Sequence, residues 1–352
     1  MSNSPATLRD VAEKAGVGTT TVARVLSGNG YVSEETRTRV EAAVAATGYR
    51  VNSLARTLKA NRSFILGHLV RSTLPNPFYM LVARGVEEYA QKHGYTALTY
   101  NVNTDAMAER KAIETFLSWR ADGIIFTTAV SAENVEFAAL RRLPLVQVER
   151  PKTTTTDRIT VHNYDAALAA VRHLTDLGHR RIAYIGTAAE AAAGPQWLSE
   201  YVERERIGAY ADAMAAVGAS TAGLMHFGES YTVDALTAQG HGYDATVRLL
   251  AGPVRPTAIF ASNDLLAAGA FQAIYEAGLR IPDDISVIGC DDTLAGYLSP
   301  QLSSVRLPAR DLGRVAAKCV IDTIEGRGGD APQVLSLDAE FILRNSTGPV
   351  RN

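Results

Sequence analysis

The chain has 352 residues, 47% hydrophobic and 20% charged, with a net charge of −2, which excludes an intrinsically disordered chain and a uniformly basic protein. Its two cysteines, Cys290 and Cys319, exclude a disulfide framework and a cysteine metal cluster. The N-terminus lacks the apolar segment of a signal peptide and no run of about 18 apolar residues occurs, so we expect a cytoplasmic protein with no membrane partner.

The charge is unevenly distributed along the chain. Residues 1–62 contain nine Lys and Arg against five Asp and Glu, a net charge of +4, so the remaining residues sum to −6. A basic segment on an acidic body is typical of a protein whose one end meets a polyanion, although an imbalance of this size also arises by chance.

Three short helical patterns occupy residues 7–48. Thr7 can cap the first helix with Asp10 as its capping-box-like partner, Ser33 can cap the third, and glycines end both. The apolar faces are Leu8, Val11, Ala12 and Ala15 in the first helix, Val22, Val25 and Leu26 in the second, and Val40, Ala43, Val44 and Thr47 in the third.

The second helix opens with Thr19, Thr20 and Thr21, although β-branched residues are poor helix formers. Two helices joined by a tight turn and braced by a third form a helix-turn-helix, in which the start of the second helix faces base edges in the major groove. Thr20, Arg24 and Ser27 point away from the apolar face, and small hydroxyls approach bases and phosphates closely. The pattern predicts a DNA-binding head; the alternative is an ordinary three-helix bundle with a Thr-rich cap.

The segment "ATLRDVAEKAGVGTTTVARVLSGNGYVSEETRTRVEAAVAATGYRVNSLARTL" resembles the head of the lactose/galactose-repressor (LacI/GalR) family of bacterial transcription regulators. The resemblance implies that the DNA-binding positions are Thr19, Thr20 and Arg24 at bases, Thr7, Ser33 and Asn52 near phosphates, and Tyr49 at the DNA-facing surface. Gly18 and Ala23 stand at positions where the family commonly has serines that contact the DNA backbone. Val51 replaces a frequent proline, so the approach to the next segment is less rigidly fixed.

That segment is "NSLARTLKANRS", and a helix this short is marginal in water by itself. The resemblance implies a hinge helix, ordered when two copies meet over the minor groove. Leu58 would then be the apolar wedge at a base step. Leu54 and Ala55 would face the partner copy, and we count Ala55 among the DNA-binding residues as well. Arg56 and Lys59 would approach phosphates. The alternative for Leu58 is a core leucine packed on the next domain.

From about residue 63, short apolar runs alternate with helical patterns, which is typical of parallel sheets with crossover helices. The runs are "FILGHLV", "YTALTYN", "GIIFTTA", "LVQVER", "RITVHN", "RIAYIG", "AIFAS" and "ISVIGCDD", too many for one comfortable sheet. The motifs "LGHRRIAYIG" and "PTAIFASNDLLAAGA" resemble the same family's body, a two-lobed periplasmic-binding-protein-like (type I) sensor domain.

The expected fold is therefore α/β, with parallel sheets behind a helical head. We expect the helix-turn-helix head at 1–52, the hinge helix and linker at 53–62, and an effector-binding and dimerisation domain at 63–347. Within that domain we expect lobe 1 at about 63–165 and 295–326, and lobe 2 at about 166–294 and 327–347.

Ligands of open α/β sheets bind beyond the carboxyl ends of the strands. Arg206 and Asp291 match the family's most characteristic effector contacts by position, and a guanidinium and a carboxylate can each hold two adjacent hydroxyls or ring nitrogens. Aromatic side chains could stack on a flat ligand face. The candidate effector-binding residues are Phe78, Tyr79, Thr127, Arg150, Asn163, Trp197, Arg206, Tyr231, Asn263 and Asp291.

Structural alternatives exist for several of these positions. Asp264 is equally suited to be a helix N-cap, and Asp292 to bind local backbone groups. Phe78 can simply pack the start of its helix. Arg206 lies on the charge-rich helix "EYVERERIGAY", where a solvated arginine would be ordinary.

No nucleotide, hydrolase, zincin or dithiol motif occurs, so we expect neither an enzyme nor a cofactor. We predict a homodimeric transcription regulator, of the repressor kind, that binds a pseudo-palindromic double-stranded DNA operator. Its small-molecule effector is expected to be a sugar or sugar derivative, with a purine as the alternative. The rival hypotheses are a body that serves only dimerisation and a solute-binding protein without a DNA role.

Overall fold

A computed structural model of the chain describes residues 6–27, 31–49, 62–71, 76–103, 105–186, 201–228, 235–329 and 331–351. The chain divides into two units, Met1–Ser63 and Phe64–Asn352, which we call the head and the body. Within these described ranges, no helix has both the length and the apolarity needed to cross a membrane.

The head contains helices α1 (Leu8–Ala15), α2 (Thr19–Ser27) and α3 (Glu34–Thr47). The predicted capping box is confirmed, because the Thr7 hydroxyl accepts from Asp10 N while the Asp10 carboxylate accepts from Thr7 N at 2.7 Å. Gly16 ends α1 at a φ of 65°, a left-handed conformation that costs glycine little. The helices share a small core of Val11, Ala12, Ala15, Val22, Val25, Val40 and Ala43.

The body contains two six-stranded sheets. Sheet A has the order β11-β5-β4-β3-β1-β2, and sheet B has the order β12-β10-β9-β8-β6-β7. The strands of sheet A are β1 (Ile65–Val70), β2 (Thr96–Asn101), β3 (Gly123–Thr127), β4 (Leu145–Val148), β5 (Asp157–His162) and β11 (Val334–Asp338). Those of sheet B are β6 (Ile182–Gly186), β7 (Met225–Phe227), β8 (Ala258–Ala261), β9 (Ser286–Asp291), β10 (Ser303–Arg306) and β12 (Glu340–Ile342).

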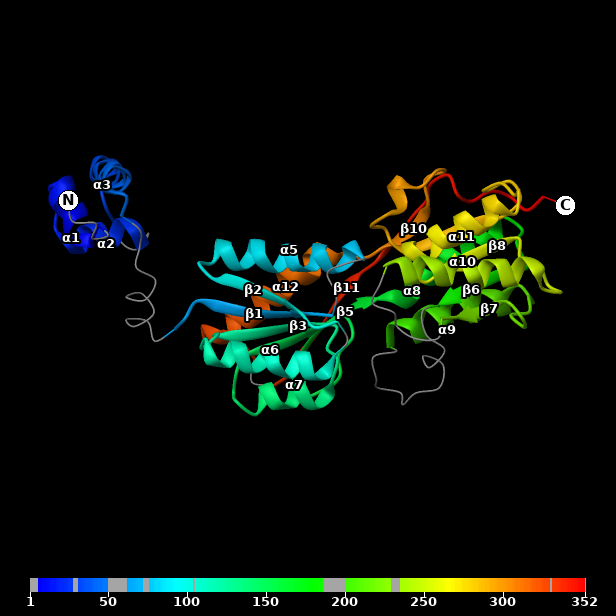
Figure 1. The fold of residues 1–352 in the computed structure, drawn as a ribbon, viewed down its shortest axis with the longest axis horizontal. Coiled ribbons are helices and arrows are strands. Elements are labelled where there is room, and N and C mark those ends of the chain that lie inside the picture. Colours follow the sequence, from blue (N-terminus) through cyan, green and yellow to red (C-terminus); the bar gives the residue numbers. More distant parts are fainter. Residues whose placement is uncertain are drawn as a thin grey trace. The chain divides into compact units, whose positions relative to one another are not determined.

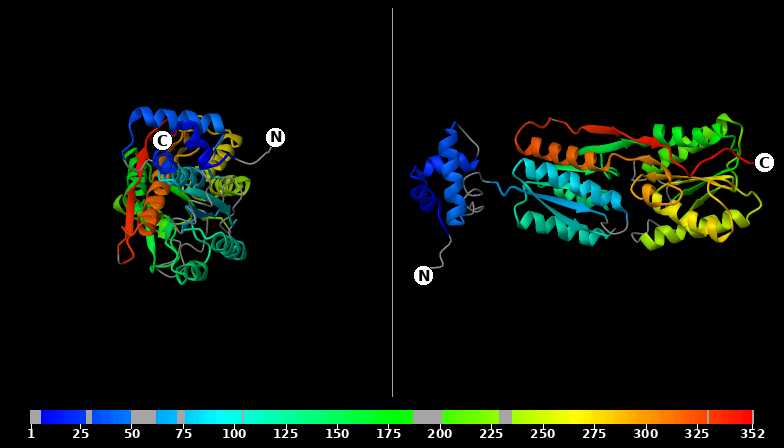
Figure 2. Two further views of the ribbon diagram at one scale, coloured as in Figure 1. Left: turned by 90° about the vertical axis from the view of Figure 1, so that its left-hand side faces the viewer. Right: turned by 90° about the horizontal axis from the view of Figure 1, so that it is seen from above.

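Helices cover both faces of each sheet (Figures 1 and 2). In sheet A, α5 (Pro77–Lys92) and α12 (Ala309–Ile324) cover one face, and α6 (Ala106–Ser118) and α7 (Ala132–Ala139) the other. In sheet B, α8 (Asn163–Asp176) and α9 (Tyr201–Ala216) lie opposite α10 (Ala235–Ala251) and α11 (Asp264–Glu276). We call sheet A with its helices lobe 1, and sheet B with its helices lobe 2. The predicted α/β fold with parallel sheets is confirmed.

All eight strands expected from the apolar runs are present. Strands β3, β4, β6, β8 and β9 are buried along their whole length, as expected of strands covered on both faces. Every neighbouring pair is parallel except β10 with β12, so most strands of one sheet direct their carboxyl ends to the same edge.

The division of the C-terminal part between the lobes differs from the expected boundaries. Strand β10 (Ser303–Arg306) extends sheet B beside β9, so this part of 295–326 belongs to lobe 2. Strand β11 (Val334–Asp338) pairs in parallel with β5 and so belongs to lobe 1, although we expected 327–347 in lobe 2. The lobes are therefore connected after β5, after β10 and after β11.

Candidate functional site

Helix α2 presents one apolar and one polar face in the head. Val22 and Val25 are buried, whereas Thr19, Thr20 and Arg24 are exposed. The three residues predicted to read bases therefore lie on the surface of the helix that follows the tight turn, as a recognition helix requires.

The other DNA-binding candidates of the head lie at helix ends. The Thr7 and Ser33 hydroxyls are exposed and cap α1 and α3 by accepting from backbone N–H groups three residues later. Tyr49 is half-buried, because its ring packs partly against the head core. Asn52, Ala55 and Leu58 lie outside the described residues.

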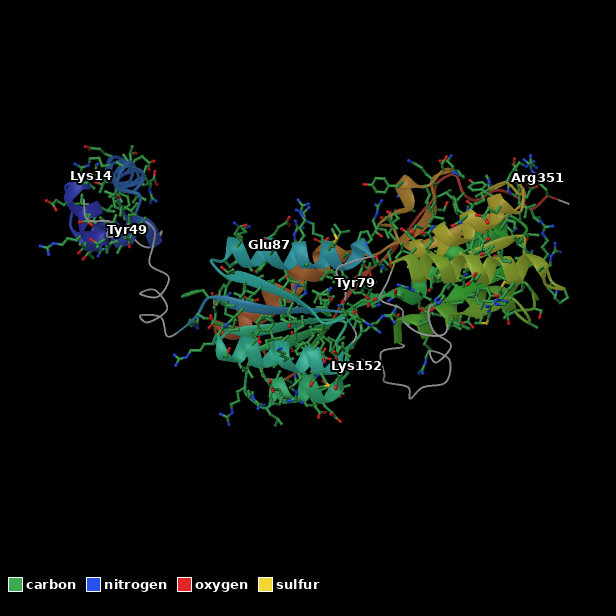
Figure 3. The ribbon with its side chains drawn as sticks, in the orientation of Figure 1. Lys14, Tyr49, Tyr79, Glu87, Lys152 and Arg351 are labelled. Atoms are coloured by element: carbon green, nitrogen blue, oxygen red, sulfur yellow. The ribbon has the colours of Figure 1, made fainter. Side chains whose placement is uncertain are left out.

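A set of charged and polar groups gathers at the carboxyl ends of the strands of both lobes, and we call it the interlobe site. Lobe 1 contributes Asn76, Tyr79, Thr128, Glu149 and Arg150, and lobe 2 contributes Asn163, Glu203, Arg206, Ser262 and Asp291. Two observations connect the lobes here: Asn76 Nδ2 donates to Asp291 Oδ2 at 2.8 Å, and the charge of Glu149 acts on Arg206. Figure 3 places Tyr79 at the end of lobe 1 that is nearest to lobe 2.

Arg206 is fixed at the centre of this site and is only 4% exposed. Its Nη1 donates to the backbone oxygen of Ser262 at 2.7 Å, and its Nε and Nη2 donate to Asn163 Oδ1 at 3.2 and 3.0 Å. Burial by itself would lower the pKa of Arg206, but the surrounding Cys290, Asp291, Glu203 and Glu149 raise it above the ordinary value. The structure therefore excludes the solvated-arginine alternative.

Asp291 ends β9 and faces the opposite lobe. Burial raises the pKa of its carboxyl to about 7, although Arg206 opposes the shift. Its φ of 99° lies in the left-handed region that residues with a Cβ rarely adopt, and such strain is found where a function or a tight turn requires it. Its partner Asn76 is itself fixed, because Asn76 Oδ1 caps α5 by accepting from Phe78 N at 2.9 Å.

Two further carboxylates hold the turn that follows Asp291. Asp264 accepts from the backbone N–H groups of Thr293 and Leu294 and from the Ser304 hydroxyl. Asp292 pairs with Arg306 at 2.7 Å and with Arg344 at 2.6 Å. Burial raises the pKa of Asp264 to about 6, and its hydrogen bonds limit the shift.

These contacts correct two expectations. Asn263, not Asp264, is the N-cap of α11, since Asn263 Oδ1 accepts from Leu266 N at 2.8 Å. Asp292 does not bind local backbone groups through its carboxylate, because two arginine side chains take it.

The lobe 1 side of the site centres on Glu149 and Tyr79. Glu149 has a φ of 71° and accepts from Arg150 Nε at 3.2 Å and from Thr128 Oγ1 at 3.5 Å. Burial raises the pKa of Tyr79, and Glu149 adds to that effect while Arg150 opposes it, which places these groups around the phenol. Tyr79 is the aromatic candidate that the structure brings to the site.

Other candidates have internal partners or lie outside the described residues. Phe78 is 3% exposed and packs in the body core, as the structural alternative proposed. Thr127 Oγ1 lies 2.8 Å from Nε2 of the buried His68, whose pKa burial lowers to about 3. Trp197 and Tyr231 lie outside the described residues.

Sequence reasoning indicated Asn76, which follows the first strand of the body, but missed Glu203 and Ser262 as members of the site. Glu203 and Arg206 are three residues apart on α9 and therefore share a helix face, which was the available signal. Ser262 was recognisable only as the residue after a predicted strand. Among the residues that the structure describes, no three His, Cys, Asp or Glu side chains group as metal ligands would.

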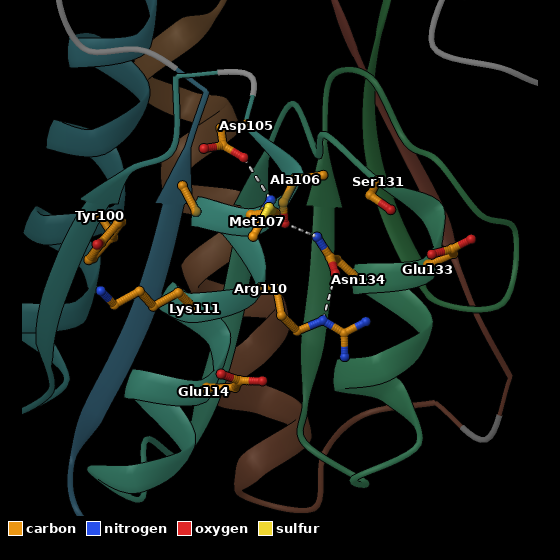
Figure 4. Close-up of a pocket in the computed structure, with 11 residues that line it drawn as sticks. Tyr100, Asp105, Ala106, Met107, Arg110, Lys111, Glu114, Ser131, Glu133 and Asn134 are labelled. Atoms are coloured by element: carbon orange, nitrogen blue, oxygen red, sulfur yellow. Dashed lines mark hydrogen bonds between the residues drawn. The ribbon is translucent and has the colours of Figure 1, made fainter.

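A separate groove of about 890 Å³ lies on lobe 1 between α6 and α7 (Figure 4). Its lining carries mixed charge from Asp105, Lys111, Glu114 and Glu133. Arg110 donates to Asn134 Oδ1 at 2.8 Å, so this guanidinium is already engaged within the lobe. The sequence did not indicate this groove, which lies at the N-terminal ends of α6 and α7 beside the end of β2.

Known proteins match both units of the chain. The family model described as bacterial regulatory proteins, lacI family, matches residues 7–52, and that of the periplasmic binding protein-like domain matches residues 171–347. The ribose operon repressor of Escherichia coli (strain K12) is 33% identical over 324 residues, which cover 91% of this chain and 93% of the relative. The HTH-type transcriptional repressor PurR of Photobacterium profundum is 31% identical over 345 residues, covering 97% and 98%.

Solved structures match over nearly the same length. The Lac repressor dimer bound to operator and the anti-inducer ONPF has a TM-score of 0.77 at 26% identity and covers 98% of this chain and 100% of that one. The complex of the transcriptional regulator CelR with cellobiose has a TM-score of 0.68 at 27% identity, covering 97% and 99%.

Proposed function

The chain belongs to the lacI family of bacterial regulatory proteins, and from this premise we propose that it is a transcriptional repressor whose operator binding is controlled by a sugar or sugar derivative. It acts in the cytoplasm on double-stranded DNA, as a homodimer whose two heads bind the halves of a pseudo-palindromic operator. The dimer bound to operator in the similar Lac repressor structure supports this arrangement. The family consists of transcription regulators, and the chain is not an enzyme.

In the proposed division of labour, residues 1–52 bind DNA and residues 53–62 form the hinge. Thr19, Thr20 and Arg24 read bases, and their exposure on α2 supports that role. Thr7, Ser33, Tyr49 and Asn52 position the head on the backbone, and Ala55 and Leu58 meet the minor groove. These latter roles follow from the resemblance of the segment alone.

One observation carries the effector role: Arg206 and Asp291 are both buried at the edge of lobe 2, where their charges act on each other, and Asp291 accepts a hydrogen bond from Asn76 of lobe 1. A molecule bound at Arg206 and Asp291, where lobe 1 meets lobe 2, contacts both lobes. Its affinity therefore depends on how the two lobes are arranged. A ligand shifts such an equilibrium only through unequal affinity for the two states. Tyr79, Arg150, Asn163 and Asn263 complete the proposed contacts, with Phe78, Thr127, Trp197 and Tyr231 as further candidates.

A sugar is the favoured effector because the site offers carboxylates, amides and a guanidinium, which suit adjacent hydroxyls. The names of two relatives point the same way, one being a ribose operon repressor and one a regulator solved with cellobiose.

The test has two parts. Operator sequences are selected from a random double-stranded library with the full-length protein and checked by footprinting. A thermal-shift screen of sugars, sugar phosphates and nucleobases then identifies the effector, which is added to the operator titration. We expect a pseudo-palindromic site and an effector that changes its affinity. Recovery of DNA without a shared sequence would contradict the repressor role, and a purine as the only effective compound would contradict the sugar.

A further inference from the structure

One charged side chain lies at the carboxyl end of each of three neighbouring strands of sheet B, and two of the three come from α9. Asp291 is the last residue of β9, and Arg206 binds the backbone oxygen of Ser262, directly after β8. Glu203 lies at the end of β6, because a Cβ on Gly186 would come within 2.6 Å of its Oε1. Since the strand order is β9-β8-β6, the charges form a row of carboxylate, guanidinium and carboxylate.

Glu203 has an incomplete set of hydrogen bonds. Its side chain is 0% exposed, and Oε1 accepts from the Tyr184 hydroxyl at 2.7 Å. Its Oε2 has no hydrogen-bond partner among the described residues, and the same holds for the buried hydroxyl of Ser262. Leaving a buried carboxylate oxygen unsatisfied is costly, so a donor supplied by a bound molecule would stabilise it.

Glu205, the other glutamate in this part of α9, has a different role. Glu205 Oε2 accepts from the backbone N–H of Asn163 at 3.2 Å, which holds the start of α8. Glu203 and Arg206, in contrast, share the helix face that meets the strand ends. Glu203 is therefore the acidic side chain of α9 that lies near Arg206 with one oxygen unpartnered among the described residues.

We propose that Glu203 is a specificity-determining residue that accepts a hydrogen bond from an uncharged sugar and disfavours phosphorylated or otherwise anionic sugars. This proposal rests on the proposed function and names the class of effector. An anionic group that approaches Arg206 meets Glu203 and Asp291 on either side and Glu149 from lobe 1, all of which act on the guanidinium. Like charges placed this close discriminate against the wrong ligand by repulsion.

The cations of lobe 1 do not reverse this preference. Arg150 is paired with Glu149 at 3.2 Å, and the charges of Arg150 and Arg71 act on Tyr79. Both belong to lobe 1, whereas Glu203, Arg206 and Asp291 belong to lobe 2. A neutral hydroxyl can donate to Glu203 or Asp291 and accept from Arg206, so it satisfies the row without adding charge.

The decisive measurement compares neutral sugars with their own phosphate esters on the full-length protein by calorimetric titration. The pairs are D-ribose with ribose 5-phosphate, D-glucose with glucose 6-phosphate, and D-galactose with galactose 1-phosphate, with cellobiose as a further neutral sugar. We expect the parent to bind at least one neutral sugar at least 10-fold more tightly than its ester.

The variant Glu203→Gln removes the charge, and its amide oxygen can still accept from Tyr184. We expect it to weaken neutral-sugar binding and to reduce the preference over the ester at least threefold. Glu133→Gln, on an exposed position of lobe 1, removes the same charge away from the site and should change neither value. If Glu203→Gln fails to fold, an ester that binds the parent as tightly as its neutral sugar still refutes the proposal.

Three results overturn the inference, and they are distinguishable. An ester that binds the parent as tightly as its neutral sugar, or more tightly, refutes the specificity assigned to Glu203 and leaves the sugar-controlled repressor intact. Binding of nucleobases but of no sugar refutes the proposed sugar effector and this inference together. An unchanged preference in a folded Glu203→Gln variant assigns the discrimination to other residues and also refutes the role of Glu203.

Discussion

Replacing Asp291 by asparagine tests two roles of this residue separately: the effect of its buried charge on the free energy of unfolding, and its part in effector binding. The carboxyl has a pKa of about 7 in the folded protein against an ordinary value of 3.8, because burial disfavours the ionised form. Because the pKa of Asp291 is raised on folding, its contribution to the free energy of unfolding is fully present at pH values below 3.8. That contribution is lost as the pH rises from 3.8 through about 7. A difference of roughly three pKa units corresponds to about 4 kcal/mol at most.

Asp291→Asn keeps an oxygen that can accept from Asn76 and removes the charge. We therefore expect its free energy of unfolding to exceed that of the parent at pH 8, and the excess to be clearly smaller at pH 5. Urea unfolding at both pH values measures this, and Asp244→Asn, on an exposed position of α10, is the matched control. Since the pKa of Asp264 is also raised, to about 6, part of the pH dependence should remain in the variant.

The same variant should lose the effector response while keeping operator binding. A lost charge-assisted hydrogen bond of about 1.5–3 kcal/mol weakens effector affinity roughly 10- to 150-fold. If Asp291→Asn is instead destabilised equally at pH 5 and pH 8, the ionised carboxylate stabilises the fold and the burial argument is wrong. If the variant is stable and still binds effector normally, Asp291 is not part of the effector site.

Three further predictions concern individual residues of the head, the hinge and the interlobe site. Arg24→Ala should cost about 1–3 kcal/mol at the operator and relax discrimination at one base pair; an equal loss on every sequence in titrations of single-base variants would make it a phosphate contact. Leu58→Ala should reduce DNA bending in circular-permutation gel shifts with no change in melting temperature, and the reverse pattern would favour a core role. Arg206→Ala should lower the melting temperature as well as effector affinity, because it leaves Asn163 Oδ1 and the Ser262 carbonyl without their donor, at about 1–3 kcal/mol each. A variant that melts like the parent would show that water replaces the guanidinium.

The positions of the main site residues were predictable because parallel strands impose a simple rule. Each apolar run predicted a strand, and the residue that ends it lies at the edge where ligands bind. Arg150 and Asp291 were found in this way, from strands that are buried throughout. The head was predictable for a similar reason, since Thr7 and Gly16 mark the ends of α1 by local interactions that require no tertiary contact.

The pairing of the C-terminal strands could not be predicted in the same way. Strands β10, β11 and β12 have three to five residues, and β11 is mostly exposed, so their sequences lack a continuous apolar run. Which lobe they join depends on the free edges of β5 and β9, which exist only after both sheets have formed. A pattern within the chain does not contain that information.

The adjacent residues Asp291 and Asp292 show most directly why residue type alone does not determine function. Both are aspartates at the end of the same strand, and both have positive φ angles, 99° and 56°. This backbone turn sends the first carboxylate towards Asn76 of lobe 1 and the second towards Arg306 and Arg344 of lobe 2. Burial therefore raises the pKa of Asp291 at the interlobe site, whereas Asp292 forms ion pairs with two arginines of its own lobe. The turn persists because Asp264, some thirty residues earlier in the chain, binds the two backbone N–H groups that follow it. The chemistry of the site therefore depends on a backbone conformation held by a distant residue, and only the folded structure reveals it.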